Sequence, residues 1–332
     1  MAFILRRLAF YAVAAWVALT LNFFIPRLMP GNAVEAILGR FPNLQPSAYK
    51  AISAMLGVGK NKGSEVSQYF TYLNNVVHFN FGTDVAQYPA SVSSLLDSEI
   101  PWTLVLVGTA TVIAFFLGTA LGIMAGWRHG GWLDRLLPAL TFLQAIPYFF
   151  LALLLVYIFA YKYFHLFPSG TGYNGSTGIV PGWHWDFITN AVQHAILPAF
   201  TIVITSVAGW MLQMRNVMIT TLGEDYVIAA QAKGLRSRRV IFTYAARNAL
   251  LPQLQGFGLA LGFVVSGAIV MEIVFSYPGV GLGLLSAVSS NDYPMMQAIF
   301  LVITFSVLLA NLIVDVLVVL ADPRARSIGA QR

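Results

Sequence analysis

Long runs of apolar residues alternate with polar segments along the chain, and six of these runs are long enough to cross a membrane as a helix. About 20 apolar residues in a helix span roughly 30 Å of hydrocarbon. The pattern therefore predicts an all-α integral membrane protein with six transmembrane helices. Their approximate ranges are 8–28, 102–127, 133–163, 195–212, 250–275 and 295–320.

Glycine and proline residues shape two of these predicted helices. In the second, Gly118, Gly122 and Gly126 recur at every fourth position, a spacing that permits close packing within this chain or against another membrane chain. The third is long enough to tilt or kink, and Pro138 and Pro147 are expected to interrupt it locally. A broken helix of this kind can line a cavity.

The polar segments divide the chain into three predicted parts. Residues 1–29 form an N-terminal transmembrane helix, residues 30–101 form a cap outside the membrane, and residues 102–332 form a five-helix core with an inner loop at 221–252. The first apolar run follows Arg6 and Arg7, which would also suit a signal peptide. Because the run is longer than a signal core, we expect it to be retained as a helix.

The distribution of positive charge predicts the orientation in the membrane. If both termini are cytoplasmic, all but six of the 19 Lys and Arg residues lie on the inner side. Inner loops of membrane proteins are enriched in these residues, so we expect cytoplasmic N- and C-termini. The six outer residues are Arg27, Arg40, Lys50, Lys60, Lys62 and Lys162.

Composition excludes several classes of protein. Of the 332 residues, 58% are hydrophobic and 10% are charged, whereas a soluble domain carries about 25% charged residues. This excludes a soluble cytosolic enzyme. The chain contains no cysteine, which excludes a disulfide scaffold and thiolate metal sites. The net charge of +6 fits loop residues that fix orientation better than a surface for nucleic acid.

No sequence motif for catalysis is evident. The segment at 57–61 is the nearest approach to a phosphate-binding loop, but it lacks the Ser or Thr that should follow Lys60 and is predicted to lie outside. The five histidines include no pair four residues apart, so no metal site is predicted. We expect the chain itself to catalyse no reaction and to bind no cofactor.

The inner loop between the fourth and fifth predicted helices is basic and partly helical. Glu224, Asp225 and the alanines that follow favour a helix start. Gly234 favours a sharp break, Ser237 is expected to cap a second short helix, and Pro252 is expected to begin the next span.

This second short helix is predicted to be amphipathic. One face carries apolar side chains and the other carries arginines, so the helix could lie on the lipid surface or insert into a groove on a cytoplasmic partner. The apolar face comprises Val240, Ile241, Tyr244 and Ala245, and the polar side comprises Arg238, Arg239 and Arg247.

Ionisable residues inside membrane spans are costly and often functional. Glu272 lies near the outer end of the fifth predicted helix, and Asp315 lies toward the inner end of the sixth, one turn after Asn311. These three residues are candidates for a transport pathway. The alternative is structural hydrogen bonding between helices, or an acidic side chain that reaches a nearby membrane surface.

The inner loop resembles a known family. Its segments 224–227 (EDYV), 230–235 (AQAKGL), 238–240 (RRV) and 247–252 (RNALLP) are similar to the so-called EAA loop of ABC-importer permeases, in particular the first-permease type of the dipeptide/oligopeptide/nickel family. Further segments resemble family signatures in the same order along the chain. They are 5–8, 28–31, 80–83, 275–281, 291–294 and 322–326. The sequence departs from the family at Tyr244, where the family often has His, and at Ile228, where distant importers have Glu.

The resemblance implies a permease subunit of an ATP-driven importer in a bacterial or archaeal inner membrane. Its partners would be a second permease chain that differs from this one, two ATP-binding subunits that hold ATP and Mg, and an outer substrate-binding protein. The resemblance assigns coupling to the ATP-binding subunits to residues of the inner loop. They are Glu224, Asp225, Tyr226, Ala229, Ala230, Lys233, Gly234, Arg238, Arg239, Tyr244, Arg247 and Asn248.

The resemblance leaves several substrates open, with peptides expected first. A peptide amine would suit Glu272, whereas Trp183 and Trp185 on an outer segment would suit oligosaccharides, and nickel has no evident ligand cluster. A different class of function, an ATPase-independent channel or secondary transporter, would need ionisable groups at mid-membrane. Only Glu272 and Asp315 qualify, and both are predicted to lie off-centre.

Overall fold

The computed structural model describes residues 2–28, 64–84, 86–87, 89–264 and 269–321. Within these ranges the regular secondary structure is helical, apart from one isolated bridge between Thr83 and Ser91, and loops join the helices. Residues 30–63 of the predicted cap, the segment 57–61 and the family-like segment 322–326 lie outside the described residues. The chain divides into two compact units, residues 1–102 with 278–308 and residues 103–277 with 309–332.

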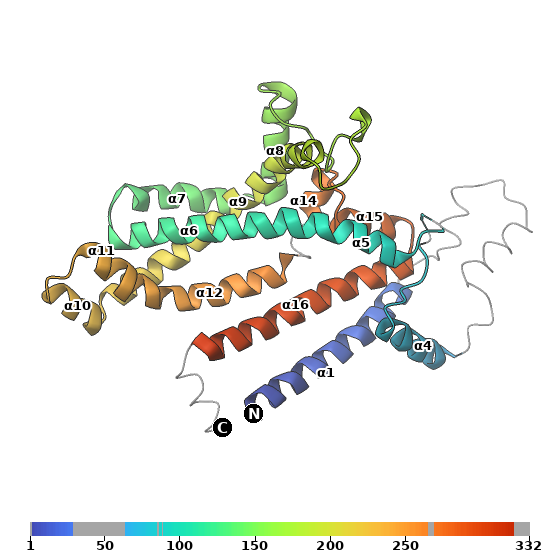
Figure 1. Cartoon of the computed structure of the whole chain (residues 1–332), viewed down its shortest axis with the longest axis horizontal. Coiled ribbons are helices and arrows are strands. Elements are labelled where there is room, and N and C mark those ends of the chain that lie inside the picture. The colour runs from blue at the N-terminus through green and yellow to red at the C-terminus, as the bar shows by residue number, and fades with distance from the viewer. Residues whose placement is uncertain (1, 29–63, 85, 88, 265–268, 322–332) are drawn as a thin grey trace, which may run out of the picture. The chain divides into compact units, whose positions relative to one another are not determined.

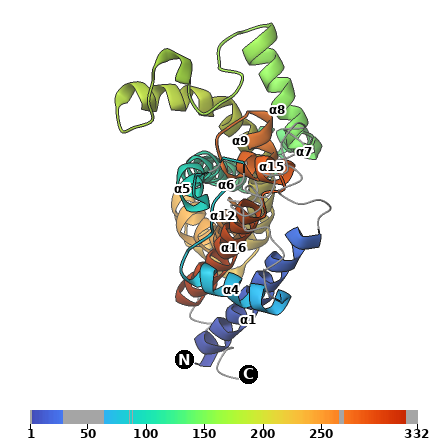
Figure 2. The ribbon, with the colours of Figure 1, turned by 90° about the vertical axis from the view of Figure 1, so that its right-hand side faces the viewer.

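The first unit combines the helices of the N-terminal part of the chain with two helices near the C-terminus. Ser64 caps the start of α4, because its side chain accepts a hydrogen bond from the Ser67 N–H. This helix crosses the end of α1 in both views (Figures 1 and 2). Phe23 is fully buried between these helices, 5.3 Å from the Tyr69 ring. The elements are α1 (Ala2–Phe24), η1 (Ile25–Leu28), α4 (Glu65–Val77), α5 (Val92–Thr103), α15 (Val280–Ser289) and α16 (Tyr293–Ala321), which continues into the second unit.

The second unit contains the remaining helices, of which α6 and α9 run side by side (Figure 1). Three π-helical segments, η2, η3 and η5, are continuous with α-helices. The elements are η2 (Leu104–Gly108), α6 (Thr109–Trp127), α7 (Trp132–Ala145), α8 (Tyr148–Val156), η3 (Tyr157–Lys162), η4 (Gly175–Thr177), α9 (Trp185–Leu222), α10 (Asp225–Ala232), α11 (Ser237–Arg239), η5 (Val240–Ala245), α12 (Ala246–Gly262) and α14 (Ile269–Val274).

The regularly spaced glycines of α6 form its contact with α9. A Cβ atom added at Gly118 would lie 2.5 Å from the Trp210 Cβ, and one at Gly122 would lie 2.6 Å from the Met211 carbonyl oxygen. A Cβ at Gly126 would lie 2.6 Å from the Met218 Cβ. Because these distances leave no room for a side chain, the glycines serve packing within this chain, the first of the two predicted uses.

Four described helices are long and apolar enough to cross a membrane, in agreement with a multi-pass membrane protein. They are Arg6–Phe24, Val92–Trp127, Trp185–Leu222 and Tyr293–Val316, and the pair Trp132–Ala145 and Tyr148–Lys162 makes a fifth if it is one broken span. The predicted bounds of the second and fourth helices are too short. Both helices continue beyond the apolar residues used to predict them and include polar residues at their ends. Pro101 lies inside the first of these two helices and Pro198 inside the second.

The third predicted helix is broken at one of its two prolines. The two halves meet at an angle of 92° between Ala145 and Tyr148. Ile146, just before Pro147, is extended, with φ −73° and ψ 127°, as expected for a residue that precedes proline. Pro138, in contrast, lies inside α7, so the predicted interruption there is wrong.

Candidate functional site

The inner loop between α9 and α12 is the candidate functional site, and it forms two helical segments joined by a tight turn. α9 ends at Leu222, and α10 follows with Glu224 at its N-cap position. Gly234 then adopts φ +71°, and its N–H donates to the Gln231 carbonyl at 2.9 Å. This left-handed backbone is readily available to glycine and ends α10, as the sequence predicts.

The second segment differs from the prediction at both of its ends. Ser237 is the first residue of α11 and not its cap; Arg236 holds the cap position, without a side-chain hydrogen bond. From Ser237 the chain continues through η5 into α12 without a break, and Pro252 lies inside α12 rather than at its start. A membrane environment and neighbouring helices allow a proline within a helix, so proline was a poor marker of the boundary.

One face of the loop is packed on the rest of the second unit. Val227, Ala230 and Val240 form a buried cluster, against which Trp127 and Tyr244 pack. A second cluster joins three alanines of η5 and α12 to α9 through its buried methionines. It consists of Met214, Met218, Ala245, Ala246 and Ala249. The loop is therefore packed against the ends of α6 and α9.

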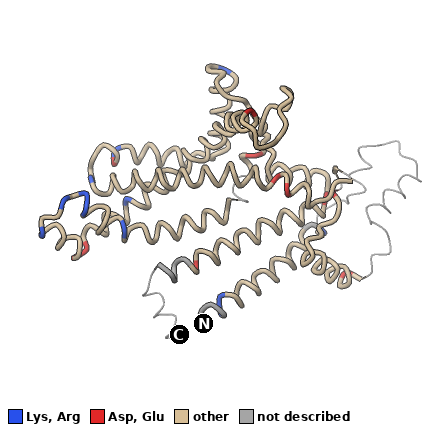
Figure 3. The backbone as a smooth tube through the Cα atoms, in the orientation of Figure 1, with Lys and Arg blue, Asp and Glu red and all other residues tan. Residues whose placement is uncertain are grey.

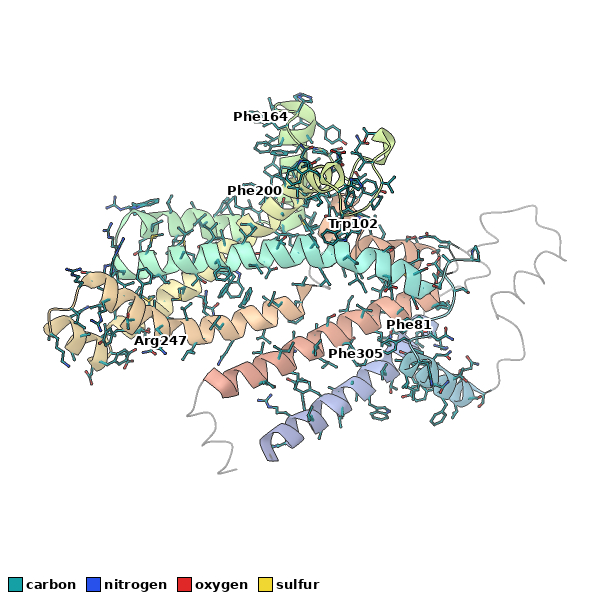
Figure 4. All side chains as sticks on the ribbon, viewed as in Figure 1. Phe81, Trp102, Phe164, Phe200, Arg247 and Phe305 are labelled. Atoms are coloured by element: carbon teal, nitrogen blue, oxygen red, sulfur yellow. The ribbon has the colours of Figure 1, made fainter. Side chains whose placement is uncertain are left out.

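The opposite face of the loop is exposed. Figure 3 shows Lys and Arg gathered on this part of the chain, and Figure 4 places Arg247 on α12 beside it. Ten of the twelve predicted coupling residues are exposed; Ala230 is buried, and Tyr244 is partly buried. These two therefore support the loop from within. The exposed ten are Glu224, Asp225, Tyr226, Ala229, Lys233, Gly234, Arg238, Arg239, Arg247 and Asn248.

An ion pair beside the loop was not anticipated from the sequence. Arg215 on α9 makes two hydrogen bonds to Asp134 on α7, from Nε at 2.5 Å and from Nη2 at 3.0 Å. The Gly130 N–H also donates to Asp134, at 2.8 Å. This bidentate pair joins the start of α7 to α9 close to the loop. Its members are 81 positions apart, and no local pattern links them.

The three pathway candidates have different environments. Glu272 on α14 is fully buried and accepts a hydrogen bond from the Thr103 hydroxyl at 2.6 Å. This matches the structural alternative, hydrogen bonding between helices. Asn311 and Asp315 are partly buried and lie one turn apart on α16. Among the described residues, no group of three or more His, Cys, Asp or Glu could hold a metal ion.

Comparison with known proteins gives one matching family. It also gives several relatives that align over nearly the whole chain. The family described as "Binding-protein-dependent transport system inner membrane component" matches residues 118–327. The di/tripeptide transport system permease protein DppB of Pseudomonas aeruginosa is 32% identical over 98% of this chain and 99% of its own length. The dipeptide transport system permease protein DppB of Escherichia coli K12 is 31% identical over 98% of both chains. The oligopeptide transport system permease protein AppB of Bacillus subtilis is 29% identical over 92% of both.

Proposed function

This chain belongs to the family of binding-protein-dependent transport system inner membrane components, and on this basis we propose that it forms half of the pathway of an ATP-driven importer of short peptides. The relatives named above are peptide permeases, which favours peptides over the oligosaccharides and nickel that the sequence left open. The family's dependence on a binding protein also argues against an independent channel or secondary transporter.

The proposed topology has six transmembrane helices with both termini in the cytoplasm. Four long apolar helices and the broken α7–α8 pair supply five crossings. We assign the sixth to the region of α12 and α14, where the sequence is apolar from residue 250 to 275. Residues 30–101 then lie outside as a cap, and the loop at 221–252 lies in the cytoplasm. An inner membrane of a bacterium or archaeon is the proposed location.

The proposed coupling mechanism rests on the two-sided structure of the inner loop. Its exposed face presents arginines and the α10 side chains to a partner, while its buried face is packed on α6 and α9. Two ATP-binding subunits, which carry ATP and Mg, would contact the exposed face. Their closure would move α10 and, through the clusters, the helices that line the pathway. A second permease chain and an external binding protein complete the assembly.

The observation that carries this proposal is the exposed basic face of the loop, and it can be tested through Arg239. We expect a purified wild-type chain to retain its co-expressed ATP-binding subunits. The Arg239→Glu variant should retain at least about tenfold less of these subunits. Reversing the charge removes an attractive interaction at a complementary interface and adds a repulsive one. Arg239→Lys, which keeps the charge, is the matched control. Equal recovery of ATP-binding subunits with Arg239→Glu and wild type would count against the docking role.

A further inference from the structure

A cavity of about 410 Å³ opens within the first unit, between the end of α1, α4 and the start of α16. Its size falls within the range of about 300–1,000 Å³ that is common for ligand pockets. The lining is rich in amide and hydroxyl groups and contains one cation. The polar residues that matter for recognition are Arg27, Gln68, Tyr72, Asn75, Asn80 and Gln297. Figure 4 shows Phe81, another lining residue, beside α4.

The cation of this cavity, Arg27, is held in place by Phe23. Its Nη1 donates to the Phe23 carbonyl at 2.6 Å, and the guanidinium carbon lies 3.6 Å from the centre of the Phe23 ring. Arg27 is nevertheless exposed, so a partner can reach it. A guanidinium has five N–H donors and commonly binds a carboxylate with two of them. Among the described residues that line the cavity there is no carboxylate, although Glu65, at the start of α4 and outside the lining, interacts electrostatically with Arg27.

The walls of the cavity are also fixed by hydrogen bonds. Asn22 on α1 is 6% exposed, and its Nδ2 donates to the Tyr72 hydroxyl on α4 at 3.1 Å. The same Nδ2 donates to the Gln297 carbonyl on α16 at 2.7 Å. Asn22 therefore ties together the three helices that form the walls. A cavity with a fixed cation and fixed walls can bind an anion without a large entropic cost of ordering itself.

We propose that this cavity receives an acidic side chain of the external binding protein. The proposal rests on the proposed function, because the proposed topology places the end of α1 and α4 on the outer face. Membership of a family that depends on a binding protein supplies the partner, and Arg27 supplies the complementary charge.

A transported peptide is a poorer occupant than a protein side chain. A free peptide carries an ammonium group as well as a carboxylate. The described lining contains the Arg27 cation but no carboxylate to pair with the ammonium, and Glu65 acts on Arg27 from outside the lining. An Asp or Glu on a protein surface brings the carboxylate alone. The cavity thus favours docking of the partner over binding of its cargo.

The test measures binding of the peptide-loaded binding protein to the complete importer in nanodiscs. Arg27→Glu should weaken binding about tenfold or more, because it removes the ion pair between position 27 and the acidic side chain of the partner. Arg27→Lys keeps the positive charge and should weaken binding less. Asn75→Asp, which keeps Arg27 but places a competing carboxylate in the cavity, should also weaken binding. Lys162→Glu reverses a predicted outer charge on a residue outside the cavity lining, and it should change the dissociation constant by less than about twofold.

Three results would overturn the proposal. One is unchanged binding with both Arg27→Glu and Asn75→Asp. Another is an equal loss with Lys162→Glu, which would indicate a diffuse effect of charge. The third is binding of free peptide that needs Arg27 and no binding protein, which would make the cavity a substrate site. Retention of the ATP-binding subunits by Arg27→Glu separates failure here from failure of the proposed function.

Discussion

Replacing Gly234 with valine is expected to abolish peptide uptake while leaving the chain in the membrane. Gly234 has φ +71°, and no atom lies within 4 Å of where its Cβ would be, so the cost is conformational rather than steric crowding by neighbours. A left-handed backbone costs a residue with a side chain about 1–2 kcal/mol, and it is least compatible with a β-branched residue. The turn would therefore open and displace α10 from η5, against which Val227 and Ala230 pack.

Gly234→Asn is the matched control for this prediction. Asparagine tolerates the left-handed region, so it should preserve the turn and keep uptake within about threefold of wild type. Valine should reduce uptake at least about tenfold, because a small displacement far from the pathway can still have a large effect on rate. Uptake of a labelled peptide by vesicles that contain the whole importer measures both. If valine and asparagine behave alike, the conformation of this turn is not what couples the loop to transport.

Reversing the charge of Asp134 is expected to destabilise the second unit and to reduce uptake. Asp134→Arg removes the bidentate pair with Arg215 and the acceptor for the Gly130 N–H, and it places two guanidinium groups together. The side chains of Arg215 and Asp134 are only 20% and 11% exposed. We therefore expect a loss of about 2–3 kcal/mol, between the values typical of exposed and buried pairs. Thermal unfolding of the purified chain measures it.

The double exchange Asp134→Arg with Arg215→Asp distinguishes the ion pair from other effects of these residues. It should restore most of the lost stability and uptake, although not all, because a guanidinium at position 134 has no acceptor for the Gly130 N–H. Arg135→Asp is the control, since Arg135 is exposed on the same turn of α7 and its change leaves the pair intact. A double exchange no better than the single variants would exclude the pair as the stabilising feature.

The sequence predicts the parts of this protein that depend on local pattern. Apolar runs locate the long helices, and the break at Gly234 follows from one residue type in a helical context. The spacing of Gly118, Gly122 and Gly126 indicates close packing, although only the structure identifies α9 as the partner. The inner loop itself is recognisable because its motif is continuous in the sequence.

Features that depend on distant residues could not be predicted in the same way. The Asp134–Arg215 pair and the Thr103–Glu272 hydrogen bond each join residues far apart in the chain. The helix bounds that the sequence predicts near prolines also differ from those in the structure. Pro138, Pro198 and Pro252 lie within helices, whereas Pro147 marks a break. Proline alone does not distinguish these cases.

The central claim is that the exposed face of the inner loop contacts an ATP-binding subunit. Because the chain contains no cysteine, a single Ala229→Cys variant carries one thiol, which a thiol-to-amine cross-linker can join to a neighbouring chain. We predict a covalent adduct with the ATP-binding subunit from Ala229→Cys and none from Ala230→Cys, whose position is 3% exposed. The contrary result is an assembled, active importer in which Ala229→Cys forms no such adduct and its thiol is instead labelled by a lipid-soluble reagent. That result would contradict docking of the loop on an ATP-binding subunit.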